Sequence, residues 1–421
     1  MSMSKFMALL RGDFREDWRG KVFLFMASQL LSLFGSSIVG FAVVWYITLE
    51  TGSSSMMTIS ILASFLPQII IAPFAGVWAD RYNRKLLIML SDSLTALATL
   101  VLVIFFLTGN GSFTLIFIIS AVRSVGSGIQ SPAIGAILPQ IVPMDQLTRI
   151  NGLHNSLTST MMLISPAVAG AMLGTAGFGY TLMIDVITAA LAVVVLSFLS
   201  VRRQRKELEE GERGVFRELA AGIRYTRHHP FIGRLLIIYA IFFFLVTPAA
   251  FLSPIMIARS FGPEVWRLTF NEIFWTGGAI FGGIIITVMG HFKDKVKTLA
   301  LSSLGFGITF ILLGLSPNFT FYIVVMFVAG IFMPFFGTAE TVLIQENVEE
   351  CMLGRVYSLV QLIISAVMPL GMLFFGPLGD RLRIETIMIA SGIGILLLIP
   401  TIWRTKIVRK EEGSREDECE I

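Results

Sequence analysis

The sequence predicts an all-α membrane protein with twelve transmembrane helices in two related six-helix halves. Apolar residues make up 55% of its 421 positions and charged residues only 14%, whereas a soluble protein carries roughly a quarter charged residues. The mean hydropathy is +0.80. Repeated apolar stretches of about twenty residues match the length that crosses a hydrocarbon core. They are continuously apolar rather than alternating, which favours helices over barrel strands. The predicted spans lie near residues 21–47, 56–79, 86–107, 113–137, 151–174, 179–200, 232–257, 268–290, 298–315, 319–345, 355–378 and 386–403.

The first apolar stretch, from Val22 to Ile47, is too long for the core of a signal peptide and lacks a small-residue cleavage site near its end. We therefore interpret it as a retained first span. Lys and Arg concentrate in alternate connecting segments, and this asymmetry predicts that both termini are cytoplasmic. With that orientation, the predicted outer loops hold only four of the 32 basic residues: Arg259, Arg267, Arg381 and Arg383.

The loop after the second span reads Gly76-Val77-Trp78-Ala79-Asp80-Arg81-Tyr82-Asn83-Arg84-Lys85. Gly76 permits close helix approach, and the basic residues hold the loop at the inner surface. The loop resembles the Gly-x-x-x-Asp-Arg-x-Gly-Arg-Arg/Lys signature of the major facilitator superfamily. Asn83 replaces the second glycine, and asparagine also tolerates a left-handed turn. The alternative is a chance basic loop that obeys the orientation rule. The resemblance implies a major facilitator superfamily fold and a cytoplasmic gating motif made of Gly76, Asp80, Arg81, Arg84, Lys85, Asp92 and Arg355.

The longest polar stretch divides the spans six and six. We predict an N-terminal half over residues 1–200, a cytoplasmic linker over 201–231, and a C-terminal half with a short cytoplasmic tail over 232–421. Apolar residues from Val215 to Ile223 recur at helical spacing. They predict an amphipathic helix on the anionic inner leaflet. A solvated tether is the plainer interpretation, and the two do not exclude each other.

The two halves carry related loops in corresponding places. Leu138-Pro139-Gln140 precedes a span with Pro166, and Leu343-Ile344-Gln345 precedes a span with Pro369. Such duplication is typical of transporters, whose substrate site lies between the repeats near the middle of the membrane.

Six further short segments, spread along the chain, carry a second resemblance. They are Ala27-Ser28-Gln29, Phe65-Leu66-Pro67, Arg123-Ser124-Val125-Gly126, Ser165-Pro166-Ala167-Val168-Ala169, Ile184-Asp185-Val186 and Gly354-Arg355-Val356. Together they resemble the macrolide-efflux branch of the drug:proton antiporters over nearly the whole length. The resemblance implies secondary active export of lipophilic drugs or macrolide-like compounds by proton antiport and alternating access. Members of the same fold also include siderophore exporters and lysophospholipid carriers, so a lipid, siderophore or metabolite carrier is the alternative.

Ionisable residues inside membrane spans are costly, so each one is a candidate for function. Asp92 is expected to pair with Arg81 or Arg84 of the loop. Arg123, near the middle of the fourth span, is expected to face a cavity or a carboxylate, and Asp185 of the sixth span is the nearest candidate by depth.

The coupling proton is expected on one or more of Asp185, Glu272 and Glu340, with Arg123 beside them. Each carboxylate also has a plainer interpretation. For Asp185 the plainer role is that of ion-pair partner of Arg123 and nothing more. Glu272 can instead reach interfacial water, and Glu340 can instead act in helix packing.

Candidate residues of the substrate cavity are Gln29, Tyr239, Phe243, Asn271, Trp275 and Phe335. Aromatic side chains can form a lipophilic pocket. The alternative is that they pack against lipid or neighbouring helices.

Several function classes find no support in the sequence. It contains no phosphate-binding loop of the Gly-x-x-x-x-Gly-Lys type, and its two cysteines and four histidines have no metal-ligand or catalytic spacing. A membrane-embedded transferase is disfavoured because the sequence offers no catalytic histidine or carboxylate pair in an interfacial loop. A channel is disfavoured because no filter-like loop lies between the spans. We therefore expect a non-enzymatic monomer in a bacterial cell membrane, with no cofactor, metal or nucleic acid. Its expected partners are a small lipophilic substrate, protons and membrane lipids, and its expected energy source is the proton gradient.

Overall fold

The computed structural model describes residues 18–201, 224–226 and 229–403. In these ranges it contains helices and turns but no strands, and twelve of the helices are long and apolar enough to cross a membrane. The predicted fold class is thereby confirmed. The amphipathic helix predicted from Val215 to Ile223 lies outside the described residues.

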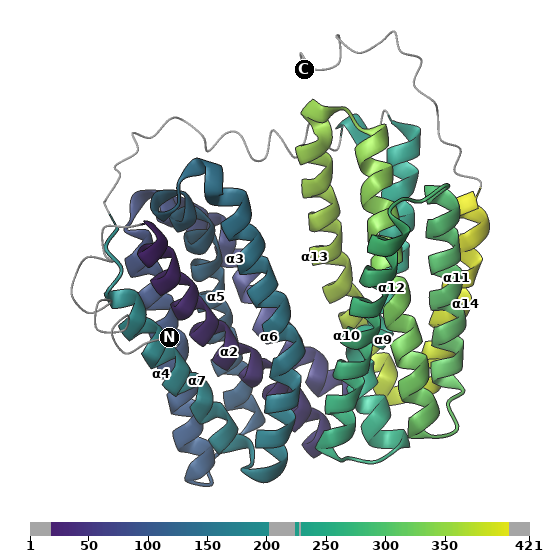
Figure 1. Cartoon of the computed structure of the whole chain (residues 1–421). Helices are drawn as coiled ribbons and strands as arrows, with labels where there is room; N and C mark the ends of the chain where they lie inside the picture. The colour runs from purple at the N-terminus through teal and green to yellow at the C-terminus, as the bar shows by residue number, and fades with distance from the viewer. Residues whose placement is uncertain (1–17, 202–223, 227–228, 404–421) are drawn as a thin grey trace. The chain divides into compact units, whose positions relative to one another are not determined.

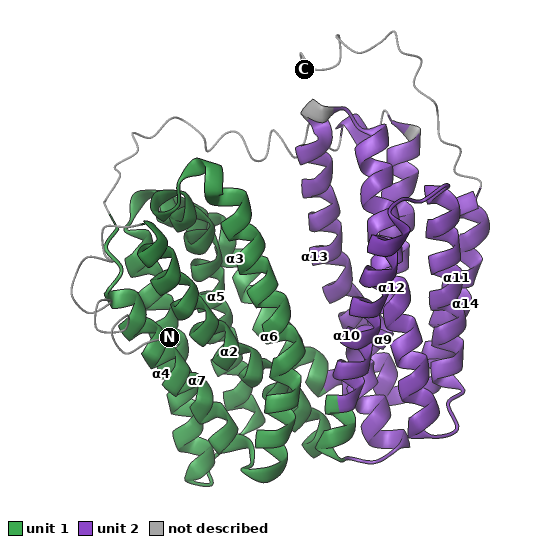
Figure 2. Cartoon of the chain, viewed as in Figure 1, with its two compact units in different colours: residues 1–51, 56–207, 264–269 green, residues 52–55, 208–263, 270–421 purple. Residues whose placement is uncertain are grey.

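The chain separates into two compact units (Figure 2). Unit 1 comprises residues 1–51, 56–207 and 264–269, and unit 2 comprises residues 52–55, 208–263 and 270–421. Unit 1 contains the helices α2 (Trp18–Thr51), α3 (Ser54–Arg81), α4 (Arg84–Leu107), α5 (Phe113–Ile141), η2 (Met144–Gln146), α6 (Leu147–Thr175) and α7 (Phe178–Ser197). Unit 2 contains α9 (Pro230–Ser260), α10 (Val265–Met289), α11 (Lys295–Gly314), α12 (Phe319–Asn347), α13 (Glu350–Arg381) and α14 (Ile384–Trp403). The first two residues of α3 belong to unit 2, and the first turn of α10 belongs to unit 1.

The same helix pairings recur in both units (Figure 1). In unit 1, α2 packs against α6 and α7, and α4 packs against α5 and α7. In unit 2, α9 packs against α13 and α14, and α11 packs against α12 and α14. In each unit these pairs join the first span to the fifth and sixth, and the third span to the fourth and sixth. This repetition confirms the two pseudo-symmetric six-helix halves.

Polar caps set where several of the membrane helices begin. Asn83 accepts a hydrogen bond from the backbone N–H of Lys85 at 3.0 Å and starts α4. Asp294 and Asn318 cap α11 and α12 in the same way, each across 2.9 Å. Such caps satisfy amides that have no partner inside the helix. Asn83 has φ −68°, so the residue that replaces the signature glycine acts as an N-cap and does not adopt the left-handed conformation that asparagine tolerates.

Unit 1 has two apolar clusters with a polar layer between them along the helices. One cluster includes Phe25 of α2 and Ile88 of α4, and the other includes Val43 of α2 and Leu102 of α4. The residues between them in sequence include buried polar side chains, among them Ser32, Asp92, Thr95, Thr99, Ser124 and Asp185. Buried polar groups require hydrogen-bond partners, so the contacts inside this layer define the candidate site.

Candidate functional site

An ion pair joins α5 to α7 inside the polar layer. Arg123 donates through Nη1 to Oδ2 of Asp185, whose side chain is completely buried, and also to the hydroxyl of Thr99. Thr99 of α4 donates to the same carboxylate oxygen at 2.8 Å, and Ser36 of α2 donates to Oδ1 at 3.2 Å. The predicted pairing of Arg123 with Asp185 is therefore confirmed, and the network ties together four helices.

A second buried carboxylate lies in the same layer but has different partners. Asp92 of α4 is only 2% exposed, and its Oδ1 accepts from Ser32 of α2 at 2.6 Å and from Nε2 of Gln130 of α5 at 2.8 Å. Its Oδ2 has no hydrogen-bond partner among the described residues. This carboxylate is an acceptor held by neutral donors.

The expected pairing of Asp92 with a loop arginine is wrong. Arg84 donates instead to the backbone oxygens of Ala79 at 2.9 Å and Ala136 at 2.7 Å, and it pairs with Asp80 at 3.4 Å. Asp92 lies eight residues along α4 from Arg84, a rise of about 12 Å. The arginine turns back to the end of α3, while Asp92 faces Ser32 and Gln130, so the two side chains point to different parts of unit 1.

The signature loop therefore braces helix ends within unit 1. Arg84 connects the ends of α3 and α5, and Nζ of Lys85 donates to the backbone oxygen of Ser197 at the end of α7, across 2.7 Å. Asp80 has a side chain that is 65% exposed. In α13 of unit 2, Arg355 donates to the sulfur of Met352 at 3.2 Å. The gating role of these residues stays a prediction.

A cavity of about 470 Å³ opens beside the polar layer of unit 1. It lies among α2, α3, α5 and α6, and we call it the unit 1 cavity. Its polar lining consists of Gln29, Ser32, Ser36, Gln68, Ser127, Gln130, Ser131, His154 and Thr158. Two of these side chains, Ser32 and Gln130, hold Asp92, so the carboxylate lies directly behind the cavity wall.

The local sequence explains how α3 and α5 come together at this cavity. The backbone N–H of Gln68, directly after Pro67, donates to the hydroxyl of Ser124 of α5 at 3.0 Å. A Cβ atom at Gly128 would lie 2.9 Å from the Cα and the oxygen of Gln68, so only glycine allows this approach. Both contacts align the glutamine-bearing stretches of the two helices.

Gln29 is the only predicted cavity residue that lines the unit 1 cavity, and sequence reasoning missed its polar neighbours. A signal was present. Gln29, Ser32 and Ser36 recur at helical spacing on one face of the first span, and Ser127 and Gln130 do the same in the fourth. Polar residues that share a face of a membrane helix usually face protein or water rather than lipid.

Unit 2 holds the other predicted residues, and it does not gather them into one site. Tyr239 and Phe243 of α9 are buried against each other, with ring centroids 4.6 Å apart, and they pack on Phe336 of α12. They belong to the core of unit 2, which is the packing role that the sequence left open. Phe335 packs on Phe292 at 6.1 Å.

The two carboxylates predicted in unit 2 have few partners. Glu340 of α12 is 4% exposed, and its Oε1 has no hydrogen-bond partner in the described part of the chain. Glu272 of α10 accepts from Nδ2 of Asn271 at 3.2 Å. Trp275 lies one turn further along the same helix and is half-buried. Of the three carboxylates proposed for proton coupling, only Asp185 has an arginine partner among the described ion pairs.

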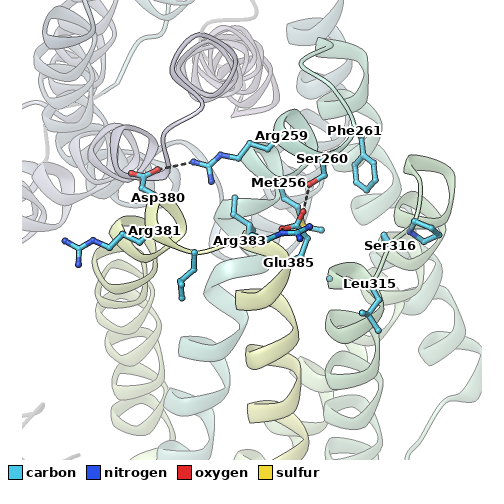
Figure 3. Close-up of a pocket in the computed structure, with 14 residues that line it drawn as sticks. Met256, Arg259, Ser260, Phe261, Leu315, Ser316, Asp380, Arg381, Arg383 and Glu385 are labelled. Carbon is cyan, nitrogen blue, oxygen red and sulfur yellow. Dashed lines mark hydrogen bonds and ion pairs between the residues drawn. The ribbon is translucent and has the colours of Figure 1, made fainter.

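A polar cluster that sequence reasoning missed lies at the predicted outer end of unit 2 (Figure 3). Asp380, near the end of α13, accepts from the backbone amides of Ser54 at 2.7 Å and Ser55 at 2.9 Å, and from the hydroxyl of Ser53 at 3.0 Å. Arg259 of α9 pairs with the same carboxylate at 3.1 Å. Asp380 therefore caps α3 through its first two residues, Ser54 and Ser55, which belong to unit 2.

Arg259 completes this cluster through backbone contacts. It donates to the oxygen of Gly52 at 2.7 Å and to the oxygen of Gly379 at 2.7 Å. A Cβ atom at Gly379 would lie 2.7 Å from the hydroxyl of Ser54, so the close approach requires glycine. The sequence did carry a sign of this cluster. Gly376-Pro377-Leu378-Gly379-Asp380-Arg381 at the end of α13 repeats the Gly-x-x-x-Asp-Arg spacing with which α3 ends at Arg81.

Comparisons with known proteins fit this architecture. Residues 17–418 match the model of the transmembrane secretion effector family (MFS_3). Macrolide efflux protein A of Streptococcus pyogenes is 28% identical over 384 residues, which cover 91% of this chain and 95% of the relative. Multidrug efflux pump Tap of Mycobacterium tuberculosis is 22% identical over 396 residues, covering 91% and 92%.

Two solved structures share the fold. A bacterial homologue of the iron transporter ferroportin, in an inward-facing state, has a TM-score of 0.69 at 15% identity, covering 91% of this chain and 98% of that one. A bacterial homolog of the lysosomal transporter Spinster has a TM-score of 0.66 at 15% identity, covering 94% and 100%. The chain belongs to the transmembrane secretion effector family, and it is a multi-pass membrane transporter of the major facilitator superfamily rather than an enzyme.

Proposed function

We propose that the chain is a secondary active exporter of lipophilic drugs or macrolide-like compounds. The observation that carries this proposal is the similarity to macrolide efflux protein A along nearly the full length of both chains. The similarity to a multidrug efflux pump supports the same substrate class. Two units with the same internal helix pairings suit alternating access, in which repeats rearrange around a central substrate site.

Proton antiport is the proposed energy source, with no bound cofactor. It is supported by carboxylates held inside membrane spans, where ionisable residues commonly serve proton transfer. Asp185, Glu272 and Glu340 remain the proposed proton carriers, and Arg123 is the group that would sense the charge of Asp185. We further propose that the exporter acts as a monomer in a bacterial cell membrane, with both termini in the cytoplasm.

The test is transport by the purified full-length protein in proteoliposomes with an imposed proton gradient. A fluorescent lipophilic cation and a radiolabelled macrolide serve as probes, and an uncoupler collapses the gradient in a parallel sample. The proposal expects uphill movement of at least one probe that the uncoupler abolishes. Absence of movement of both probes, with the protein folded and inserted, would overturn drug export and favour a lipid, siderophore or metabolite carrier. Movement that the uncoupler does not affect would overturn proton coupling.

A further inference from the structure

We propose that Asp92 of α4 is a proton-binding group that controls the wall of the unit 1 cavity. This role is separate from that of the three proposed proton carriers. The binding of the proton follows from the surroundings of Asp92 alone. For its effect on export the inference rests on the proposed function, which it deepens by adding a carboxyl whose charge regulates the transporter.

Asp92 and Asp185 occupy two different levels of the polar layer. The contacts between α4 and α5 place Asp92 beside Gln130 and Thr99 beside Arg123. In each of these two helices the two residues are seven positions apart, which is about 10 Å along the axis. The guanidinium at one level therefore serves Asp185, while the other level offers Asp92 only an amide and a hydroxyl.

The helices packed around Asp92 supply no counter-charge from their described residues. Arg123 is the only charged residue of α5, and Asp185 is the only one of α7. Helix α2 carries charges only near its ends, about 16 Å or more along the axis from its contact with Asp92: Arg19, Lys21 and Glu50. An ionised Asp92 would therefore be a buried charge without a counter-ion, and a second carboxylate lies about two turns away.

The two oxygens of Asp92 differ in a way that suits a protonated carboxyl. Oδ1 lies 2.6 Å from the hydroxyl of Ser32 and 2.8 Å from Nε2 of Gln130, whereas Oδ2 has no partner among the described residues. In an ionised carboxylate both oxygens share the charge, so a buried Oδ2 without a donor is costly. With a proton on Oδ1, which the oxygen of Ser32 can accept, Oδ2 becomes a carbonyl oxygen and needs a donor far less.

The unit 1 cavity gives the proton a route to this carboxyl. Ser32 and Gln130 belong to the cavity wall, and the size and polar lining of the cavity suit water. The hydroxyl of Ser32 can pass its proton to Oδ1 of Asp92 while its oxygen takes another proton from water in the cavity, and the reverse steps release the proton. His154 of α6 is the titratable residue of the lining, and histidine exchanges protons near neutral pH.

The charge of Asp92 acts on the cavity wall through the same two contacts. Hydrogen bonds to an ionised carboxylate are roughly twice as strong as those between neutral groups. Loss of the proton therefore tightens the hold on Ser32 and Gln130, which also lie 3.5 Å apart through Oγ and Nε2. Uptake of the proton loosens both side chains, so the pH controls how firmly this part of the wall is fixed.

The experiment is infrared difference spectroscopy on the purified full-length protein in lipid nanodiscs at acidic and alkaline pH. A protonated carboxyl absorbs separately from a carboxylate. Asp92→Asn keeps an oxygen that can accept the same two hydrogen bonds. It is expected to lose the signal of one protonated carboxyl and to keep the melting temperature of the wild type. Ser32→Ala keeps the carboxyl but removes its hydroxyl partner, so the signal is expected to shift in frequency.

A matched control is Ser120→Ala, which removes another buried hydroxyl of unit 1 that does not contact Asp92. Its carboxyl signal is expected to equal that of the wild type. A signal that is the same in the wild type and in Asp92→Asn, or that the folded wild type lacks at both pH values, would overturn the proton site. If Asp92→Asn does not fold, an unshifted signal in Ser32→Ala would overturn it instead.

Export measurements distinguish this inference from the proposed function. At a constant pH difference across the proteoliposome membrane, wild-type export is expected to differ by about threefold or more between acidic and alkaline conditions, and export by Asp92→Asn by less than about 1.5-fold. An equal pH response of the two proteins would overturn the control of the cavity wall. If the wild type exports neither the lipophilic cation nor the macrolide, the proposed function falls, and the infrared result still decides whether Asp92 binds a proton.

Discussion

Arg123 of α5 and Asp185 of α7 form a salt bridge inside the polar layer of unit 1, with the Asp185 side chain fully buried. The hydroxyls of Thr99 and Ser36 satisfy the same carboxylate from two further helices. A buried charge pair contributes little net stability when intact, but removing one partner leaves an uncompensated charge. Four helices of unit 1 therefore depend on both charges remaining together.

The first prediction is that Asp185→Asn destabilises the protein strongly. It leaves Arg123 without its counter-charge, which is expected to lower the free energy of unfolding by about 3–5 kcal/mol. Denaturant unfolding in detergent micelles measures the change. The double variant Arg123→Gln/Asp185→Asn is expected to recover much of the loss, because no unpaired charge remains.

A matched control for this prediction is Glu264→Gln, which removes the partner of Arg267 in a pair whose glutamate side chain is 48% exposed. Exposed pairs contribute about 0–1 kcal/mol, so this variant is expected to unfold like the wild type. If Asp185→Asn were no less stable than Glu264→Gln, the structural importance of the buried pair would be refuted.

The second prediction concerns the cap that Asp380 provides to α3. Asp380→Ala removes the acceptor of two backbone amides and of Arg259. Loss of a helix cap costs about 0.5–2 kcal/mol, and the partly exposed pair with Arg259 adds little. We expect a lower melting temperature and faster proteolytic cleavage at residues 52–55.

Gly379→Ala tests the same cluster without changing any charge, because its Cβ would press on the hydroxyl of Ser54. It is expected to show the same increase in cleavage as Asp380→Ala. Gly283→Ala is the control, since nothing lies within 4 Å of a Cβ at that glycine. Cleavage that is unchanged in both Asp380→Ala and Gly379→Ala would contradict the assigned contacts.

The sequence predicted the fold more completely than the site, for a physical reason. Hydropathy locates the membrane spans, and the position of a residue within its span gives its depth in the membrane. Depth alone is enough to match Arg123 with Asp185. The direction in which a side chain points around its helix is a separate quantity. Proximity along the chain predicts that Asp92 pairs with Arg81 or Arg84, but its side chain faces Ser32 and Gln130.

Contacts that depend on distant backbone are harder to predict. Asp380 accepts hydrogen bonds from the backbone amides of Ser54 and Ser55, far away in sequence, and backbone donors carry no side-chain pattern that would mark them in the sequence. The repeated Gly-x-x-x-Asp-Arg spacing was visible in the sequence. It becomes informative only once the helix ends at Arg81 and Arg381 are known.

The third prediction separates bracing from gating in the signature loop. Arg84→Ala removes the hydrogen bonds to Ala79 and Ala136, so it is expected to lower both the melting temperature and transport. Asp80→Ala removes an exposed carboxylate, and the free energy of unfolding is expected to change by less than about 1 kcal/mol. If the loop gates, transport by Asp80→Ala nevertheless falls by about tenfold or more. Transport at the wild-type rate in Asp80→Ala would exclude the gating role.

The fourth prediction identifies the proton carrier by separating exchange from gradient-driven export. The carboxylate that carries the proton is needed when substrate movement is driven by a gradient, but it is not needed for exchange of labelled for unlabelled substrate. Glu340 and Glu272 are compared as Glu340→Gln and Glu272→Gln. Glu340 is buried with one oxygen unpaired among the described residues, while Glu272 already accepts from Asn271. Neutralising Glu340 breaks no described ion pair, so we expect this variant to fold normally.

For Glu340→Gln we therefore expect export driven by the proton gradient to fall by about tenfold or more, with exchange within about twofold of the wild type. Glu346→Gln lies six residues further along α12, where its side chain is 48% exposed and pairs with Lys295, and it is expected to keep both activities. If Glu340→Gln and Glu272→Gln both retain gradient-driven export, neither residue carries the proton, and Asp185 remains as the candidate. In that case the stable double variant Arg123→Gln/Asp185→Asn should exchange substrate yet fail to respond to the gradient, because a network without either charge can neither bind nor release the proton.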